Sequence, residues 1–179
     1  MLDQRNQTYS RNLILIHWGV ALLIAAAFAT IELRELFEKG SVPREGLKSV
    51  HFYLGITILA LVLVRLFVRA REQAPAITPP PPSWQIGMSH LLHTLLYGFM
   101  LVMPVLGWLT MSAAGKPIPF GLPALVAESK DAAGWYKELH HLLGQIFYIV
   151  IGLHIAGALV HHLALKDNTL KRMMPDRGA

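Results

Sequence analysis

Four long stretches without charged side chains constrain the fold of this chain more than any other feature. Residues 13–31, 50–64, 73–115 and 139–165 contain no Asp, Glu, Lys or Arg. A helix needs about 20 mostly apolar residues to cross the hydrocarbon core of a bilayer. We therefore expect an all-α membrane protein, a four-transmembrane-helix bundle with spans at about residues 13–33, 48–70, 85–112 and 136–165.

The overall composition agrees with a chain that faces lipid. Hydrophobic residues make up 54% of the 179 residues and charged residues 15%, whereas roughly 25% charged residues is usual in soluble proteins. The net charge of +5 lies in short clusters between the uncharged stretches, which favours a lipid bilayer over nucleic acid as a partner. We expect residues 1–179 to form a single transmembrane domain.

The distribution of Lys and Arg predicts the orientation of the chain. Four spans place both termini on one side of the membrane, and cytoplasmic segments carry an excess of basic residues. With the termini inside, the inner segments carry the nine basic residues Arg5, Arg11, Arg65, Arg69, Arg71, Lys166, Lys171, Arg172 and Arg177. The outer loops carry the seven residues Arg34, Lys39, Arg44, Lys48, Lys116, Lys130 and Lys137. Both termini are therefore expected to be cytoplasmic.

Three residues within the spans have expected structural effects. Pro104 and Gly107 are expected to kink the outer half of the third span. Arg65 lies near the inner end of the second span, where its long side chain can reach the membrane interface. The basic N-terminus also resembles the start of a signal peptide, but the apolar stretch that follows is long for one and contains His17.

Histidines at two depths indicate metal ligands. The chain has no cysteine, which excludes thiolate metal sites and covalently attached c-type haem, and it has nine histidines. His140 and His154 are 14 residues apart in the fourth span, so they lie within about 40° of one helix face and about 21 Å apart along it. By depth, His51 pairs with His140 near the outer side, and His17 pairs with His154 near the inner side.

A ligand pair from two helices, with no third ligand close by, suits the iron of a porphyrin. Zinc needs about four ligands close together. The pairs therefore predict two b haems, and small residues such as Gly55, Gly144, Gly152 and Gly157 would let a flat ring approach the helices. The alternative for a single membrane histidine is a hydrogen bond at a helix contact. Spacing favours His140 over its neighbour His141 only modestly, so both stay open as the ligand.

The remaining histidines lie near the inner side. His90 and His93 begin the third span, and His161 and His162 end the fourth. One of them could bind a quinone headgroup or relay a proton. His161 is the quinone candidate, because it lies seven residues past His154 and so on nearly the same helix face. The alternative is a purely interfacial histidine, which is favoured for His90 and His162.

Several sequence motifs resemble those of the bacterial cytochrome b561 family, and the resemblance covers nearly the whole chain. They are Ile16-His17-Trp18, Val50-His51, Ser89-His90-Leu91-Leu92-His93, Gly152-Leu153-His154 with His161-His162, and the tail from Lys166 to Pro175. The resemblance implies four helices, two b haems and the axial ligands His17, His51, His140 and His154. It thereby favours His140 over His141, although Leu139-His140-His141 stands here where a relative has Trp-His-Glu.

The resemblance also implies a function. A superoxide-oxidising relative takes electrons from superoxide at the outer face of the membrane and passes them to ubiquinone. The resemblance therefore implies that this chain lies in a bacterial inner membrane and carries out the same reaction. Outer bases such as Arg44, Lys48, Lys116, Lys130 and Lys137 could attract superoxide, neutralise haem propionates or only signal topology. The alternative function is a cytochrome b subunit that links a partner dehydrogenase or hydrogenase to the quinone pool. A non-redox transporter is disfavoured, because the spans hold no embedded carboxylate.

Overall fold

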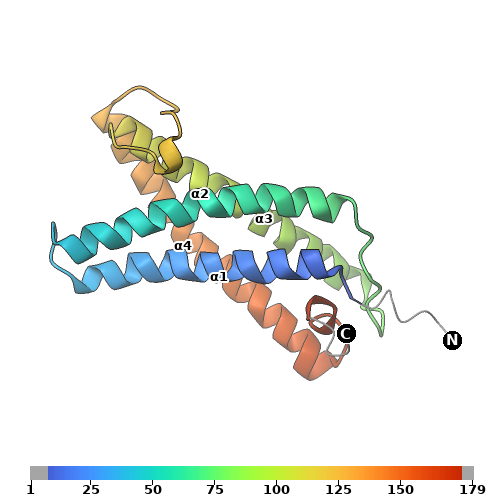
Figure 1. Ribbon diagram of the computed structural model, residues 1–179. Coiled ribbons are helices and arrows are strands. Elements are labelled where there is room, and N and C mark those ends of the chain that lie inside the picture. Colours follow the sequence, from blue (N-terminus) through green and yellow to red (C-terminus); the bar gives the residue numbers. More distant parts are fainter. Residues whose placement is uncertain (1–7, 175–179) are drawn as a thin grey trace.

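The computed structural model describes residues 8–174, and within them the regular structure is entirely helical (Figure 1). Four helices, each long and apolar enough to cross a membrane, confirm the predicted all-α fold. They are α1 (Arg11–Leu33), α2 (Val42–Ala70), α3 (Ser83–Ala113) and α4 (Lys130–Val160). Short turns follow some of them: η2 (Arg34–Leu36), η3 (Pro119–Gly121), the π-helical η4 (His161–Leu165) and η5 (Lys171–Met173).

The helix ends reflect local capping. The Ser10 and Ser129 side chains accept hydrogen bonds from Leu13 N–H and Ala132 N–H at the starts of α1 and α4. A proline in the first turn of α2 also suits a helix start. Both α2 and α4 begin before the expected spans, because polar residues outside the membrane extend each helix. The expected kink in α3 does not break the helix, which continues through Pro104.

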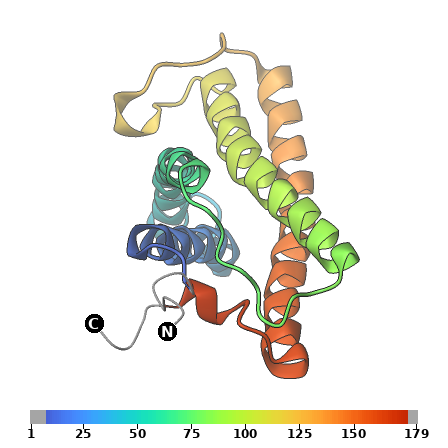
Figure 2. The ribbon, with the colours of Figure 1, turned by 90° about the vertical axis from the view of Figure 1, so that its right-hand side faces the viewer.

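The helices form two antiparallel pairs that cross each other. α1 packs beside α2, α3 packs beside α4, and α2 connects the pairs through α3 (Figures 1 and 2). All four helices contribute to one buried cluster, composed of Val20, Ala27, Ile58, Val62, Met100 and Phe147. Every helix therefore takes part in the core.

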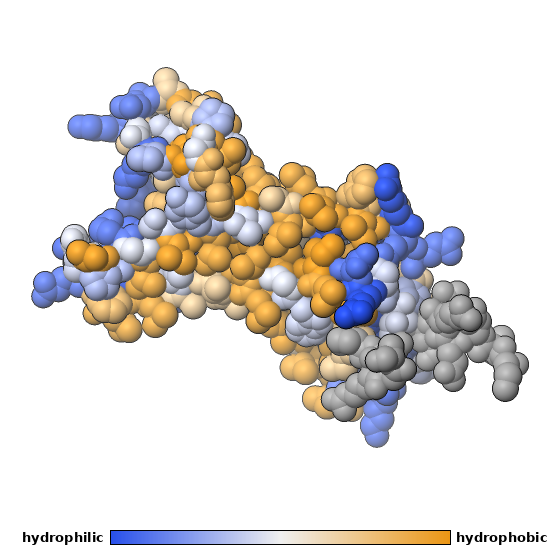
Figure 3. All heavy atoms as spheres, viewed as in Figure 1, coloured by the Kyte–Doolittle hydropathy of each residue, from blue (hydrophilic) through white to orange (hydrophobic). Residues whose placement is uncertain are grey.

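Most apolar side chains outside this core point outward. Leu22 is 70% exposed, and Leu63 and Leu153 are also more than half exposed. Figure 3 shows a broad hydrophobic band between hydrophilic ends of the molecule. Such a surface is stable in contact with lipid and not with water. The chain is a multi-pass membrane protein.

The two ends of the bundle differ in what they hold. The terminal end holds both described chain ends, where Tyr9 N–H donates to the Arg172 carbonyl over 3.0 Å. The loop end holds the α1–α2 connection and the α3–α4 connection (Figure 1). Four spans require this arrangement. Arg5 and Arg177, two of the residues used to predict orientation, lie outside the described residues, as does Pro175 of the tail motif.

Candidate functional site: two histidine pairs

α4 contributes one histidine to each of two close pairs. The rings of His51 in α2 and His140 have centroids 6.2 Å apart, with 82° between their planes. The rings of His17 in α1 and His154 have centroids 6.4 Å apart, with 70° between planes. The structure thus brings together the four histidines in the two pairs expected from depth. Their role as haem ligands stays a prediction.

The distances within both pairs suit one metal ion held between two imidazoles. A metal–nitrogen bond of about 2 Å, added to the roughly 1 Å from that nitrogen to the ring centre, predicts centroids about 6 Å apart. All four rings are half-buried. The described residues contain no group of three or more His, Cys, Asp or Glu that could hold a metal ion. Two-ligand coordination therefore fits these residues better than a zinc-type site.

Hydrogen bonding orients one ring of the loop-end pair. His51 Nδ1 lies 2.9 Å from the Ala27 carbonyl, and since a carbonyl only accepts, Nδ1 must carry the hydrogen. Nε2 of His51 then keeps its lone pair for a metal, as in most histidine-ligated metal sites. Nδ1 of His17 is buried without a hydrogen-bond partner within residues 8–174. Such a group costs free energy, and structures tolerate it chiefly at functional sites.

Small residues leave room beside the pairs. Gly55, one turn from His51, and Gly157, near His154, are half-buried, yet an added Cβ at either would meet no other atom within 4 Å. This space suits a flat macrocycle beside the helix. At Gly107 an added Cβ would lie 3.6 Å from Cε1 of His140. Gly107, which the sequence marked only for a kink, therefore determines how closely α3 approaches this ring.

The structure adds two residues to the terminal-end pair. The ring of His93 in α3 lies 5.3 Å from that of His154, centroid to centroid. The Arg65 guanidinium lies 5.4 Å from the centre of the Tyr97 ring, and its Nε is buried without a hydrogen-bond partner in the described part of the chain. Arg65 thus packs against α3. In the sequence, the feature that pointed to Arg65 is that it is a lone cation in an apolar stretch, at the depth of His17.

The other histidines lie apart from both pairs. His140, and not its exposed neighbour His141, faces His51. His141 lines a hollow of about 300 Å³ together with Gly134, Lys137 and Glu138. His90 is exposed, whereas His161 is half-buried and lies 2.5 Å from an Asp167 oxygen. The quinone candidate His161 is therefore the one with a carboxylate partner.

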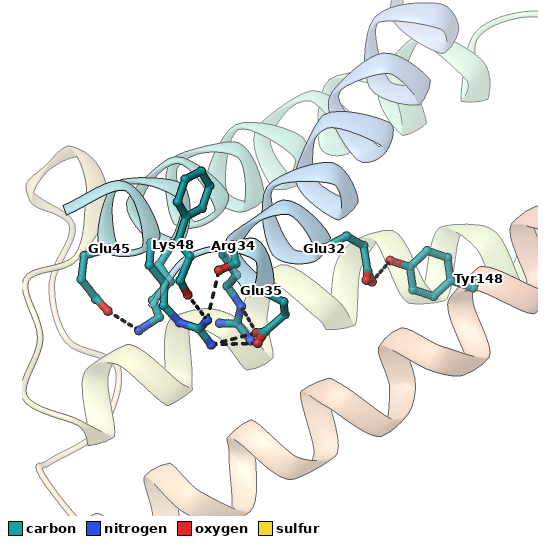
Figure 4. Close-up of polar contacts among 8 residues, drawn as sticks. Glu32, Arg34, Glu35, Glu45, Lys48 and Tyr148 are labelled. Atoms are coloured by element: carbon teal, nitrogen blue, oxygen red, sulfur yellow. Dashed lines mark hydrogen bonds and ion pairs between the residues drawn. The ribbon is translucent and has the colours of Figure 1, made fainter. Parts of the chain in front are cut away.

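Ion pairs occupy two of the bases that were expected to attract superoxide (Figure 4). Arg44 is 8% exposed and binds both carboxylate oxygens of Glu35, at 3.0 and 2.9 Å. It also donates to the carbonyls of Arg34 and Phe37. Lys48 pairs with Glu45 at 2.5 Å. The Arg44 contacts stabilise the α1–α2 connection, whereas the Lys48 pair lies within α2. Both cations already have a carboxylate partner, so neither is well suited to attract an anion.

A cavity at the loop end is lined by another of these bases. It has a volume of about 580 Å³, and Lys116 and Glu128 lie in its wall with Ser112 and Gly115. Nearby, the Tyr148 hydroxyl donates to Glu32 over 2.9 Å, across α4 and α1 (Figure 4). A small anion at this end would therefore meet Lys116 in the wall of this cavity or Lys137 in the wall of the smaller hollow.

The family model of prokaryotic cytochrome b561 matches residues 8–176. The chain belongs to the prokaryotic cytochrome b561 family. Membership implies electron transfer in a membrane and a b-type haem, and it confirms the family resemblance seen in the sequence motifs.

Two named relatives match nearly the whole chain, and a third matches a little over two thirds of it. Probable superoxide oxidase CybB of Yersinia pestis is 39% identical over 175 residues, 96% of this chain and 98% of that protein. Cytochrome b561 homolog 1 of Escherichia coli (strain K12) is 36% identical over 172 residues, 94% of this chain and 98% of that protein. Cytochrome b561 homolog 2 of the same strain is 32% identical over 137 residues, 70% and 69% of the two chains.

Proposed function

We propose that this protein binds two b haems, oxidises superoxide at one face of the bacterial inner membrane and reduces ubiquinone at the other. The observation that carries the proposal is the pairing of His17 with His154 and of His51 with His140 at nearly equal ring distances. His140 and His154 lie 14 residues apart on α4, so the two sites are stacked across the bundle.

The histidine pairs favour a role in electron transfer over a role in which a substrate binds to the haem iron. Haem supplies reversible one-electron chemistry when bound. His17 with His154, and His51 with His140, would hold the two irons and would leave no position at either iron for dioxygen or superoxide. At the terminal end, the Arg65 guanidinium lies within electrostatic reach of His17 and His154, where it would neutralise a propionate.

The orientation follows from the basic residues of the terminal end. Those in the described part of the chain are Arg11, Arg65, Arg69, Arg71, Lys166, Lys171 and Arg172. Over the whole sequence, which adds Arg5 and Arg177, the terminal segments carry nine basic residues and the loop segments seven. This excess supports a cytoplasmic terminal end and a periplasmic loop end. Superoxide would then approach the loop end, where Lys116 lines the larger cavity.

Quinone reduction is assigned to the terminal end, with His161 as the headgroup ligand. His161 follows His154 by seven residues and is half-buried. Two superoxide anions release two electrons and two molecules of dioxygen, and ubiquinone takes up two electrons and two protons. The likeness to the relative named probable superoxide oxidase supports superoxide as the electron donor.

The proposal is tested with purified protein in lipid nanodiscs. A pyridine haemochrome assay should give two b haems per chain. Stopped-flow mixing with superoxide should reduce the haems faster than superoxide dismutes, and added ubiquinone should reoxidise them. Haems that superoxide does not reduce, but that a dehydrogenase or hydrogenase partner does, would support the electron-transfer subunit instead. A colourless protein would exclude both.

A further inference from the structure

The end of α4 folds back so that Asp167 lies against His161. The π-helical turn His161–Leu165 follows α4, and Lys166 has left-handed backbone angles (φ 56°, ψ 31°) that reverse the chain. Asp167 Oδ2 lies 2.5 Å from His161 Nδ1, and the Asp167 N–H donates to the His161 carbonyl over 3.1 Å. Two hydrogen bonds therefore hold the carboxylate at this imidazole.

The Asp167 carboxylate is buried and fully engaged. It is 4% exposed, and its second oxygen accepts the Thr169 N–H over 2.8 Å. Burial disfavours its charge, but the hydrogen bonds from His161 and Thr169 outweigh this and hold the pKa of Asp167 below its ordinary value. An ionised carboxylate only accepts, so Nδ1 of His161 carries the hydrogen and Nε2 is the free nitrogen.

Residues 167–173, here called the C-terminal clamp, are bound to the α2–α3 connection. The Asn168 side chain accepts the Thr78 N–H over 2.8 Å and donates to the Ala76 carbonyl over 3.2 Å. Arg172 donates to the Pro75 carbonyl. These contacts fix the clamp across a sequence separation of about 90 residues.

The clamp is also bound to the start of α1. The Tyr9 N–H donates to the Arg172 carbonyl, and the Trp18 indole N–H donates to the Met173 carbonyl over 2.8 Å. Trp18 is the neighbour of His17, a proposed ligand of the terminal-end haem. The clamp therefore holds Asp167 at a fixed position relative to both His161 and the terminal-end histidine pair.

We infer that Asp167 is a positioning residue for quinone reduction: it orients Nε2 of His161 toward the quinone and stabilises the imidazolium that donates a proton to the quinone oxygen. This role rests on the quinone reduction proposed above. A carboxylate that holds a histidine in one tautomer and stabilises its charged form is an effective arrangement for proton transfer.

The chemistry balances with the proposed substrates. Each quinone receives two electrons, which superoxide supplies, and two protons. For each proton, the Nε2–H bond of the His161 imidazolium breaks, its electron pair stays on nitrogen, and an O–H bond forms on the quinone. The neutral imidazole then takes a proton from water at the terminal end. Asp167 remains ionised throughout and forms no covalent bond.

The test follows the acceptor reaction alone. Full-length protein with both haems, in nanodiscs, is reduced with dithionite, freed of excess reductant and mixed with decyl-ubiquinone in a stopped-flow instrument. Asp167→Asn keeps the size and the hydrogen-bond acceptor but removes the charge. We expect the rate at saturating quinone to fall at least about tenfold. The KM for quinone, the haem content and the rate of haem reduction by superoxide should change less than about twofold.

Two control variants separate the charge from the packing. Asp131→Asn changes an exposed acid at the start of α4 and should keep the full rate. Asn168→Ala removes two clamp hydrogen bonds but leaves the Asp167 charge and the Asn168 N–H bond to the Thr78 carbonyl, so it should slow the reaction much less than Asp167→Asn does. An Asn168→Ala rate as slow as that of Asp167→Asn, with haem intact, would assign the effect to clamp packing and overturn the inference.

The remaining outcomes distinguish this inference from the proposed function. If Asp167→Asn reoxidises as fast as the unmodified chain, Asp167 has no such role, while the proposed function stands. If superoxide does not reduce the haems but Asp167→Asn still slows quinone reduction, the donor is wrong and the role of Asp167 holds. If quinone does not reoxidise the unmodified chain, both the acceptor and the role of Asp167 are wrong.

Discussion

The ring of Phe147 in α4 stacks on the ring of Phe99 in α3, with 5.1 Å between centroids and 12° between planes. Phe147 is seven residues from His140 and seven from His154, and it is 5% exposed. It therefore lies on the shared face of α4, between the two histidine pairs. Phe28 of α1 completes this aromatic layer, 5.9 Å from Phe147.

Phe147→Ala should destabilise the bundle strongly. Removing a buried phenylalanine costs about 3–5 kcal/mol in well-packed cores. We expect a clear shift in unfolding by SDS in mixed micelles, and a smaller one for Phe147→Leu, which refills part of the volume. Ile149→Ala, at a neighbouring position that is 64% exposed, is the control and should unfold as the unmodified chain does. Equal shifts for Phe147 and Ile149 would mean that the aromatic layer adds no stability.

Removing one histidine of a pair should remove one haem. His17→Ala or His154→Ala is expected to lower the pyridine haemochrome value from two haems to one, with loss of one component in a redox titration. His51→Ala or His140→Ala should remove the other component. His90→Ala, at an exposed position, should keep both haems. If His17→Ala and His51→Ala removed the same component, the pairing would be wrong.

A small residue at position 107 should be required for the loop-end haem alone. A Cβ at this position would lie in ordinary contact with the His140 ring, so Gly107→Ala should be tolerated. Gly107→Leu has to displace the ring and should lose the haem of the His51/His140 pair. Gly98→Leu, on the same helix with no atom near its Cβ, is the matched control. Haem content and absorption spectra check this, and retention of both haems by Gly107→Leu would contradict it.

Arg44 should stabilise the loop end more than Lys48 does. Arg44→Ala removes charge-assisted hydrogen bonds to two carbonyls from a buried position, and should lower the thermal midpoint by roughly 5 °C. Arg44→Lys should not restore it, because an ammonium cannot make the same set of contacts. Lys48→Ala breaks an exposed pair and should change the midpoint by less than about 2 °C. Differential scanning fluorimetry in detergent measures these midpoints. Equal shifts for Arg44→Ala and Lys48→Ala would contradict the prediction.

Acid should open the C-terminal clamp. Burial opposes the charge of Asp167, but its hydrogen bonds outweigh burial and lower its pKa in the folded chain. The ionised form of Asp167 therefore stabilises the fold. This stabilisation is fully present at a pH above the ordinary pKa of 3.8, and it is lost as the pH falls through the lowered pKa of the folded chain.

Trp18, which donates to Met173 in the clamp, reports this opening. Its fluorescence, measured as the difference between the unmodified chain and Trp18→Phe, should stay constant down to about pH 4 and change below it. Asp167→Asn should abolish the transition. A transition near pH 6 would instead point to protonation of a histidine.

Hydropathy and helical periodicity were sufficient to predict the four helices and to place His140 and His154 on one face. Both properties are local, since a span is determined by its own side chains and a face by the turn angle. The approach of His93 to His154 and the packing of Arg65 on Tyr97 depend on how helix pairs cross, which no single segment encodes. The pairing of Arg44 with Glu35 depends likewise on the geometry of the turn between α1 and α2, which the sequence pattern did not predict.

The placement of His140 and His154 on one helix also imposes an order of biosynthesis. α4 leaves the ribosome after α1, α2 and α3, and each pair lacks one member until it does. α1, α2 and α3 must therefore enter the membrane before α4, and neither histidine pair can form until α4 has joined them. A nascent chain arrested before residue 130 has neither pair, so both pairs form only after α4 has been made.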